Sequence, residues 1–362
     1  MADLTELRGK IDEIDEKLAA LFEARMQVAA DVARYKQAHG LPVLQSGREA
    51  EVLEKNAARI ADAALKPYAM DFYRNLMAQS RMYQKTLQGK KADIGFYGIA
   101  GSFSHEACTR FIAAHPDTAF TPRPYETFDA LCRGLYNEEI DYAVIPLENS
   151  TTGPVTDVYD LLMRYQFYIV GEVLVHVNHN LMAPAGAQLS DIREVYSHPQ
   201  AFMQCKEFLR NYDFEHKPYF NTAISAKFVA ESGRKDIAAI ASEGAAKLYG
   251  LKVLEHNINQ NANNITKIVI LSREAHTAPD CDRVSVVLSL PNKPGSLLHA
   301  MNSFAGLNMT KIESRPDVTN PFDYYFFIDF EGNAADEKVQ TVIAQLQETA
   351  KQYRYLGNYR RF

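Results

Sequence analysis

The chain has 362 residues, of which 47% are hydrophobic and 23% charged, a balance typical of a globular protein of two or three domains. Its formal net charge of -6 argues against a nucleic-acid partner, because phosphate binding requires a basic surface. The four cysteines form neither a CxxC metal motif nor a disulfide pattern, and we find neither a signal peptide nor a membrane-spanning apolar run. We therefore expect a cytoplasmic protein with no membrane partner and no metal site.

Residues 1 to about 88 are predicted to be helical throughout. Apolar residues from Leu4 to Tyr35 recur at alternating steps of three and four, the pattern of one long helix packed on others. Arg25 interrupts this stripe, and a charge there is costly unless it is paired or binds an anion. Lys36 lies three turns further along nearly the same face, so Arg25 and Lys36 could hold opposite ends of one small dianion.

Arg8 flanks the same stripe, but it precedes Arg25 by seventeen residues, or ~25 Å along a straight helix. Arg8 therefore cannot reach a ligand that Arg25 of its own chain holds. Two interpretations stay open. Either Arg8 is merely solvated, or a second copy of the helix runs antiparallel and delivers Arg8 to the partner's site.

Two further helices are expected, one from Ser46 and one from Pro67. Ser46 and Glu49 form a Ser-x-x-Glu capping box, so Glu49 also has a purely structural explanation. In the third helix the polar residues Ser80 and Gln84 lie one turn apart within an apolar stripe. They indicate either a ligand-filled interior or ordinary polar residues at a helix interface.

Together these helical motifs resemble the all-helical chorismate mutase domain over its full length. The matching motifs are Leu7-Arg8-x-Lys10, Arg25, Lys36, Pro42-Val43, Arg48-Glu49 and Ser80-x-x-x-Gln84. The resemblance implies an intertwined dimer that binds chorismate within helical bundles. It also implies that Arg8 of one chain, with Arg25 and Arg48 of the other, holds the two carboxylates.

The same resemblance assigns Lys36 and Gln84 to the ether oxygen of chorismate as its bond breaks. Glu49 and Ser80 match hydroxyl and carboxylate contacts, whereas Gln45 stands where the family usually has Asp. A pericyclic rearrangement needs no nucleophile, only a compact substrate conformer and fixed positive charge where oxygen becomes negative. No cofactor is therefore expected for this step.

Beyond a polar linker at 88–92, apolar runs alternate with helical stretches to about residue 271, as in α/β domains. Strands are expected at 94–97, 141–146, 168–177, 193–196, 237–241 and 265–271. We interpret 141–146 as a buried parallel strand whose ladder ends at Pro146. The preceding glycines at 95, 98 and 101 follow a G-x-x-G-x-x-G spacing, which speaks against the G-x-G-x-x-G dinucleotide fingerprint.

Polar side chains cluster where these strands should end, which is where open α/β sheets bind ligands. The clusters lie at 98–105, 148–152, 196–205, 221–222 and 263–267. Each cluster can also be a Ser-, Thr- or Asn-rich turn that only caps a helix. His198 is expected to be a packed or capping residue, and His176 with His179 a polar strand edge rather than a metal pair.

In order, the motifs G-x-x-G-S-F-S-H, D-Y-A-V-I-P-L-E-N-S, Y-S-H-P-Q and N-N-x-T resemble prephenate dehydratase. The resemblance implies two α/β lobes like those of a periplasmic binding protein, with prephenate in the cleft between them. It makes Thr266 catalytic and places Asn149, Ser197 and Gln204 at the substrate. Loss of hydroxide and carboxylate yields an aromatic ring, so a hydroxyl donor in a desolvated pocket suffices without a cofactor.

The two residues that follow Thr266 depart from the Thr-Arg-Phe sequence that is usual in the family. Lys267 keeps the charge of the arginine but lacks the planar fork that grips a carboxylate at two points, and Ile268 lacks an aromatic face. These departures concern how the substrate is gripped and leave the catalytic assignment of Thr266 unchanged.

After a polar linker at 272–283, the pattern predicts the order βαββαβ of a ferredoxin-like sandwich. Its strands are expected at 284–290, 309–315, 324–330 and 353–359, and its helices at 295–304 and 337–349. Pro294-Gly295-Ser296-Leu297 and Glu313-Ser314-Arg315-Pro316 resemble the two motifs of the ACT regulatory domain that bind L-phenylalanine between paired domains. Without a ligand, these motifs would still start a helix and end a strand.

These resemblances imply a bifunctional chorismate mutase and prephenate dehydratase, inhibited by phenylalanine and assembled as a homodimer or larger homo-oligomer. The expected domains are helical at 1–90, two-lobed α/β at 93–271 and ACT-like α+β at 283–362. A different class stays open: a two-lobed ligand sensor that has lost catalysis. A fused mutase and dehydrogenase is a further alternative, but it would require a proper dinucleotide fingerprint.

Overall fold

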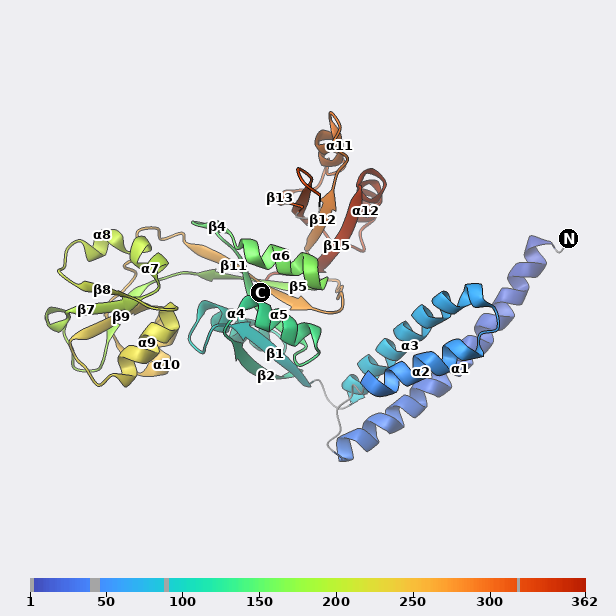
Figure 1. The fold of residues 1–362 in the computed structure, drawn as a ribbon, viewed down its shortest axis with the longest axis horizontal. Helices are drawn as coiled ribbons and strands as arrows, with labels where there is room; N and C mark the ends of the chain where they lie inside the picture. Colours follow the sequence, from blue (N-terminus) through green and yellow to red (C-terminus); the bar gives the residue numbers. More distant parts are fainter. Residues whose placement is uncertain (1–2, 40–45, 88–90, 318–319) are drawn as a thin grey trace. The chain divides into compact units, whose positions relative to one another are not determined.

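The computed structural model describes residues 3–39, 46–87, 91–317 and 320–362 (Figure 1). The chain divides into two compact units, one formed by residues 1–91 and the other by nearly all of the remaining chain. Within the described residues, every helix is too short or too polar to cross a membrane.

The first unit is helical, as predicted. It contains α1 (Leu4–Ala38), α2 (Ser46–Arg59), the short 3-10 helix η1 (Ala63–Leu65) and α3 (Lys66–Leu87). Gly40 and Pro42, which the sequence predicts to end the first helix, lie among residues 40–45, outside the described residues.

The apolar stripe of α1 is largely exposed within this single chain, so the predicted packing on other helices is not provided by α2 and α3 alone. Leu4, Ile11 and Leu21 are 60%, 55% and 67% exposed, and the buried residues of α1 are small ones, among them Ala29 and Ala33. Length explains this: the 35 residues of α1 span ~52 Å, whereas α3 has 22 residues and α2 has 14.

The first lobe of the second unit is a mixed sheet with strand order β2-β1-β3-β11-β5, with β4 paired to β3. Its strands are β1 (Lys91–Tyr97), β2 (Ala119–Tyr125), β3 (Tyr142–Asn149), β4 (Gly153–Pro154), β5 (Tyr168–His176) and β11 (Ile265–Ser272), and its helices are α4 (Phe103–Ala113), α5 (Phe128–Tyr136) and α6 (Thr156–Tyr165). Apolar residues of α4 join the core on one face of the sheet, and those of α5 and α6 join the core on the other.

Strand β3 does not end at Pro146, contrary to the sequence prediction. It pairs in parallel with β1 only as far as Val144, so the missing N–H of Pro146 disrupts no ladder on that side. On its other side β3 runs antiparallel to β11, with Pro146 opposite Ile268 and a bulge at the next residue pair. The strand therefore continues to Asn149.

The second lobe is also a mixed sheet, with strand order β10-β6-β9-β7-β8. Its elements are β6 (Asn180–Ala183), η2 (Leu189–Asp191), β7 (Glu194–Ser197), α7 (Pro199–Gln204), α8 (Lys206–Leu209), β8 (Glu215–Pro218), α9 (Thr222–Glu231), β9 (Ile237–Ala241), α10 (Glu243–Tyr249) and β10 (Lys252–Glu255). Figure 1 shows this lobe in yellow beside the first, and the chain crosses between them at 177–179 and 256–264. Two crossings between two α/β lobes match the predicted two-lobed architecture.

The predicted βαββαβ order is found in the C-terminal segment. It consists of β12 (Arg283–Ser289), α11 (Ser296–Asn302), β13 (Met309–Pro316), β14 (Tyr324–Glu331), α12 (Glu337–Thr349) and β15 (Gln352–Tyr359). The sheet order is β13-β14-β12-β15, with every pairing antiparallel. This is the topology of a ferredoxin-like sandwich.

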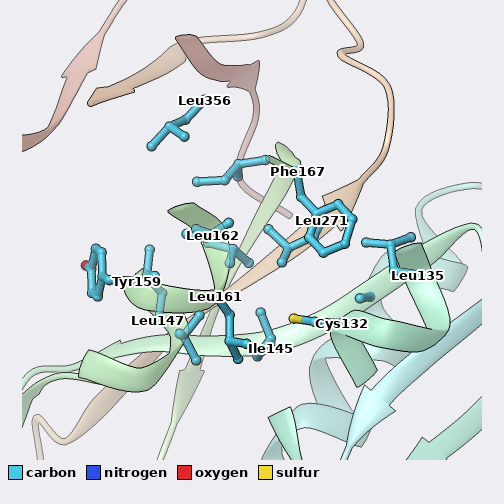
Figure 2. Packing of buried hydrophobic residues seen from close by; sticks show 14 of the residues in the cluster. Cys132, Leu135, Ile145, Leu147, Tyr159, Leu161, Leu162, Phe167, Leu271 and Leu356 are labelled. Atoms are coloured by element: carbon cyan, nitrogen blue, oxygen red, sulfur yellow. The ribbon is translucent and has the colours of Figure 1, made fainter. Parts of the chain in front are cut away.

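The C-terminal sheet packs directly on the first lobe. Leu356 and Tyr359 share one hydrophobic core with Leu147 and Tyr159, part of which Figure 2 shows. A Cβ added to Gly357 would lie 2.0 Å from the carbonyl oxygen of Ile169, so only glycine permits this approach of β15 to β5. The sheet and the lobe therefore form one packed body.

Candidate active site

Antiparallel pairing of β11 with β3 places Thr266 opposite Asn149, 117 residues earlier in the chain. Asn149 Nδ2 donates a hydrogen bond to Thr266 Oγ1 at 3.0 Å. Asn149 is buried and Thr266 is partly exposed. Two residues that the sequence assigned to the same site are therefore in direct contact.

The side-chain amide of Asn149 is held in one orientation by the turn that follows it. Its Oδ1 accepts hydrogen bonds from the backbone N–H groups of Thr151 and Thr152 at 3.0 and 3.1 Å. Its Nδ2 therefore faces β11, where it also donates to Asn264 Oδ1 at 2.7 Å. Because Thr266 Oγ1 accepts a bond from this amide, its own hydrogen is left to donate to another group.

Side-chain contacts connect the two lobes at the predicted clusters 98–105 and 148–152. The hydrogen bonds run from Ser242 Oγ to the Gly101 carbonyl (3.0 Å), from Tyr249 Oη to the Ala100 carbonyl (2.6 Å) and from Gln200 Nε2 to Thr152 Oγ1 (3.3 Å). Gly101 has φ of +86°, and a Cβ added there would lie 3.2 Å from Ala245 Cα. The glycine-rich turn thus allows close approach of the lobes.

The prediction that His179 lies at a polar strand edge is wrong. His179 is buried, with 2% of its surface exposed, at the junction of the lobes. Its Nε2 lies 2.8 Å from Gln204 Oε1, and its ring meets that of Phe103 edge-on at 6.0 Å between centroids. An amide oxygen only accepts, so Nε2 carries the hydrogen. Burial lowers the pKa of His179 and the Gln204 bond only partly opposes this, so the ring is neutral at pH 7.

No local sequence signal marks the contact between His179 and Gln204, because the two residues are 25 positions apart. The hydrogen bond occupies the oxygen of the Gln204 amide and leaves its NH₂ group to donate. His179 therefore sets the orientation of a predicted substrate residue.

The other predicted residues of the second lobe have structural partners. Ser197 is fully buried and donates to the Ile240 carbonyl at 2.8 Å, between β7 and β9. His198 caps α7, as predicted, because its Nδ1 accepts from the Gln200 N–H at 3.2 Å. Asn221 likewise caps α9 through a 2.7 Å bond from the Ile224 N–H.

The side chains of Lys267 and Ile268, the two departures after Thr266, are both largely enclosed by other parts of the protein. Lys267 projects to the opposite face of β11, where it pairs with acidic side chains. Ile268 is fully buried in the hydrophobic core beneath α4. In this chain Lys267 therefore faces carboxylates of the protein, and Ile268 belongs to the core.

In the helical unit, α1 and α3 bring together three predicted residues. Arg25 Nη1 donates to Ser80 Oγ, and Ser80 in turn donates to the Leu76 carbonyl at 2.9 Å. Burial lowers the pKa of Arg25, an effect that Tyr73 partly opposes. Gln84, one turn beyond Ser80, is buried, and its Oε1 has no partner among the described residues. This group can donate from a guanidinium and an amide to an anionic ligand.

The structure says less about the remaining predicted mutase residues. Arg8 is exposed and Lys36 is half-buried on α1. Arg48 and Glu49 belong to α2, but their side chains lie outside the described residues, as does Gln45.

The two C-terminal motifs lie on different elements of the ferredoxin-like sandwich. Gly295 caps α11 with φ of +81°, and Ser296 and Leu297 help to line a cavity of about 170 Å³ with Phe322 and Tyr324. The second motif, Glu313-Ser314-Arg315, lies on the edge strand β13 and does not line this cavity. Among the described residues, the first motif therefore borders this cavity and the second does not.

Residues 94–276 match the family described as prephenate dehydratase, and residues 7–85 match chorismate mutase type II. The bifunctional chorismate mutase/prephenate dehydratase of Escherichia coli strain K12 is 32% identical over 98% of this chain and 96% of its own length. The chloroplastic arogenate dehydratase/prephenate dehydratase 1 of Arabidopsis thaliana is 37% identical over 80% of this chain and 79% of its own. A crystal structure of prephenate dehydratase in complex with L-Phe, from Arthrobacter aurescens, is 32% identical with a TM-score of 0.65, covering 74% of this chain and 90% of that one. The chain therefore belongs to the family of bifunctional chorismate mutase/prephenate dehydratases.

Proposed function

We propose that this chain rearranges chorismate to prephenate and converts prephenate to phenylpyruvate, with loss of water and carbon dioxide. The observation that carries the dehydratase assignment is the bond from the oriented Asn149 amide to Thr266. Supplying purified protein with chorismate, then with prephenate, tests the proposal by formation of phenylpyruvate. A ligand sensor would bind these compounds without turnover.

We assign the two reactions and their control to three parts of the chain, at 1–90, 93–271 and 283–362. In the first, Arg8, Arg25 and Arg48 bind the carboxylates of chorismate, Lys36 and Gln84 act on its ether oxygen, and Glu49 and Ser80 bind its remaining polar groups. The contact between Arg25 and Ser80 supports this grouping. Fixed positive charge stabilises the negative charge that grows on the ether oxygen.

In the second part, the Thr266 hydroxyl donates a hydrogen bond to the departing hydroxyl, and the NH₂ group of Gln204 binds prephenate. Asn149 orients Thr266, and the buried Ser197 supports this side of the site through its bond to the Ile240 carbonyl. Aromatisation supplies the driving force, so assisted departure of hydroxide is the main task of the protein. The Arabidopsis relative is named for arogenate as well as prephenate. Rates with the two compounds, measured side by side, decide which one this chain prefers.

We propose that the chain is at least a homodimer. Besides the residues already given, Leu7, Ile14, Leu18 and Val28 of the α1 stripe are also exposed. Covering this stripe with α1 of a second copy would remove apolar surface from water, which is the main driving force of association. An antiparallel arrangement would also bring Arg8 of one copy to Arg25 of the other.

We propose that the C-terminal segment is an ACT domain whose two motifs bind L-phenylalanine between paired copies. The ferredoxin-like topology supports this, as does the cavity beside Ser296 and Leu297. Ser314 is exposed on edge strand β13, where a second copy can approach it. Phenylalanine would inhibit if it favours one pairing of these domains over another.

Ser314→Ala is expected to weaken inhibition of the dehydratase by phenylalanine at least roughly fivefold, the loss of one or more hydrogen bonds to the effector. Activity without phenylalanine should be unchanged. Thr341→Ala, which removes an exposed hydroxyl from α12 of the same domain, is the control. An unchanged inhibition curve for Ser314→Ala would remove this residue from the effector site.

His179→Ala is expected to raise the KM for prephenate about tenfold and to leave mutase activity unchanged, because Gln204 loses the bond that orients it. His216→Ala is the control, since His216 is an exposed histidine of the same lobe that stacks on Phe202. Equal KM values for the two variants would argue against an orienting role.

A further inference from the structure

Lys267 lies beside Thr266 on β11, but its side chain enters a different environment. Side chains alternate along a strand, so Lys267 points toward the face that the C-terminal sheet covers. Three carboxylate oxygens lie within 4 Å of its Nζ: Asp329 Oδ2 at 3.2 Å, Glu172 Oε2 at 3.7 Å and Glu148 Oε2 at 3.8 Å.

Two more cations complete this group, which we name the charge cluster. Lys311 Nζ lies 2.7 Å from Glu148 Oε2, and Arg361 Nε lies 2.7 Å from Glu172 Oε1. The three cations Lys267, Lys311 and Arg361 thus face three carboxylates. Burial acts to lower the pKa of Lys267, but the carboxylates outweigh it and the pKa stands above its ordinary value. Lys267 is therefore charged throughout the physiological range.

The three carboxylates come from three different strands. Glu148 precedes Asn149 on β3, and Glu172 lies on β5 and is only 1% exposed. Asp329 belongs to β14 of the C-terminal sheet and is itself fixed by a 2.5 Å bond from Ser285 Oγ. Lys267 therefore ties β11 to both of its neighbouring strands and to the C-terminal sheet.

The ladder between β11 and β3 is interrupted at this point. Lys267 is paired with Glu148 and Ile268 with Pro146, so Leu147 is the extra residue of a bulge. The extra residue bends β3 and loosens its pairing with β11, whereas β11 stays paired with β5 from Ile265 to Ile270, so the restraint on β11 is reduced on the β3 side. Side-chain contacts at Lys267 can supply the missing restraint.

From these contacts we propose that Lys267 is a positioning residue for the dehydratase, and that Asp329 of the C-terminal sheet is its principal anchor. Held between the three carboxylates, Lys267 fixes the stretch of β11 that presents the Thr266 hydroxyl to the substrate. The C-terminal sheet is thereby part of the support of the active site. This inference rests on the proposed catalytic role of Thr266.

The sharpest test is Asp329→Asn, which keeps the shape of the side chain and removes its charge. The expected result is a fall in dehydratase kcat of roughly tenfold with KM changed less than about twofold, because small displacements of a catalytic group cost rate rather than binding. Mutase activity and thermal unfolding, measured on the same samples, report whether the protein is folded.

Arg354→Met is the matched control for a loosened domain contact. Arg354 also belongs to the C-terminal sheet, and it donates to the Leu162 and Phe167 carbonyls of the first lobe, both at 2.7 Å. It touches neither β11 nor the charge cluster. The dehydratase kcat of Arg354→Met should therefore stay near that of the unchanged protein. An equal loss of kcat in Arg354→Met and Asp329→Asn would overturn the inference.

Lys267 variants complete the test. Lys267→Arg should retain most activity, whereas Lys267→Met should lose as much as Asp329→Asn. The double variant, in which charge is again balanced, should lose no more than Lys267→Met alone, because both changes break one interaction. Multiplying losses, or normal kcat in Asp329→Asn, would overturn the inference. Retained activity in Thr266→Ala would instead refute the proposed function beneath it.

Discussion

Thr266→Ala is expected to lower dehydratase kcat by about 10²- to 10⁴-fold, the contribution typical of a positioned proton donor, and to leave mutase activity unchanged. The reason lies in the bond from Asn149 Nδ2 to Thr266 Oγ1. This bond occupies the oxygen as an acceptor, so the hydroxyl hydrogen is directed away from Asn149. This hydrogen can bond to the departing hydroxyl and stabilise the negative charge that grows on its oxygen as the bond to carbon breaks.

Two substitutions at the same position separate the hydroxyl from the shape of the side chain. Thr266→Val keeps the branched shape and should be as inactive as Thr266→Ala, whereas Thr266→Ser keeps the hydroxyl and should retain substantial activity. Both reactions are followed in the full chain, by loss of chorismate and by formation of phenylpyruvate. Parallel loss of both activities in Thr266→Ala would contradict the assignment and indicate misfolding.

The elements that the sequence predicted well have a clear apolar pattern, which is periodic in the helix and continuous in the strand. The helix expected at 337–349 is found as Glu337–Thr349, and the buried strand expected at 237–241 as Ile237–Ala241. In both, the pattern of apolar residues reflects directly which side chains are buried. The strands that were missed are short or mostly exposed, such as Ala119–Tyr125 with two prolines and Glu215–Pro218. Such strands carry no clear alternation.

The site was predictable as a set of residues but not as a geometry. The resemblance of the motifs indicated Thr266 and Asn149, yet no local pattern reveals that strands 117 residues apart are neighbours. The role of Lys267 was also hidden, because its partner Asp329 is 62 positions away on another sheet. Contacts of this kind depend on tertiary packing, which sequence periodicity does not encode.

Mixing Arg8→Ala chains with Arg25→Ala chains is expected to restore mutase activity that neither variant has alone. If each site takes Arg8 from one chain and Arg25 from the other, a mixed dimer has one intact site and one doubly defective site. Random pairing makes half of the dimers mixed, so recovery should approach about one quarter of the unmodified activity. Co-expression of the two chains provides the mixed dimers.

A second mixture provides the control for subunit sharing. Arg25 contacts Ser80 of its own chain, so Arg25→Ala and Ser80→Ala damage the same half of the proposed site. Mixing these two variants should give no more activity than the average of the parents, since no site in the mixed dimer escapes both changes. Recovery confined to the mixture of Arg8 and Arg25 variants would mean that the exposed Arg8 reaches Arg25 only across two chains. Absence of recovery in both mixtures would mean that Arg8 is a solvated residue and that the exposed stripe of α1 does not bring it to the partner's site.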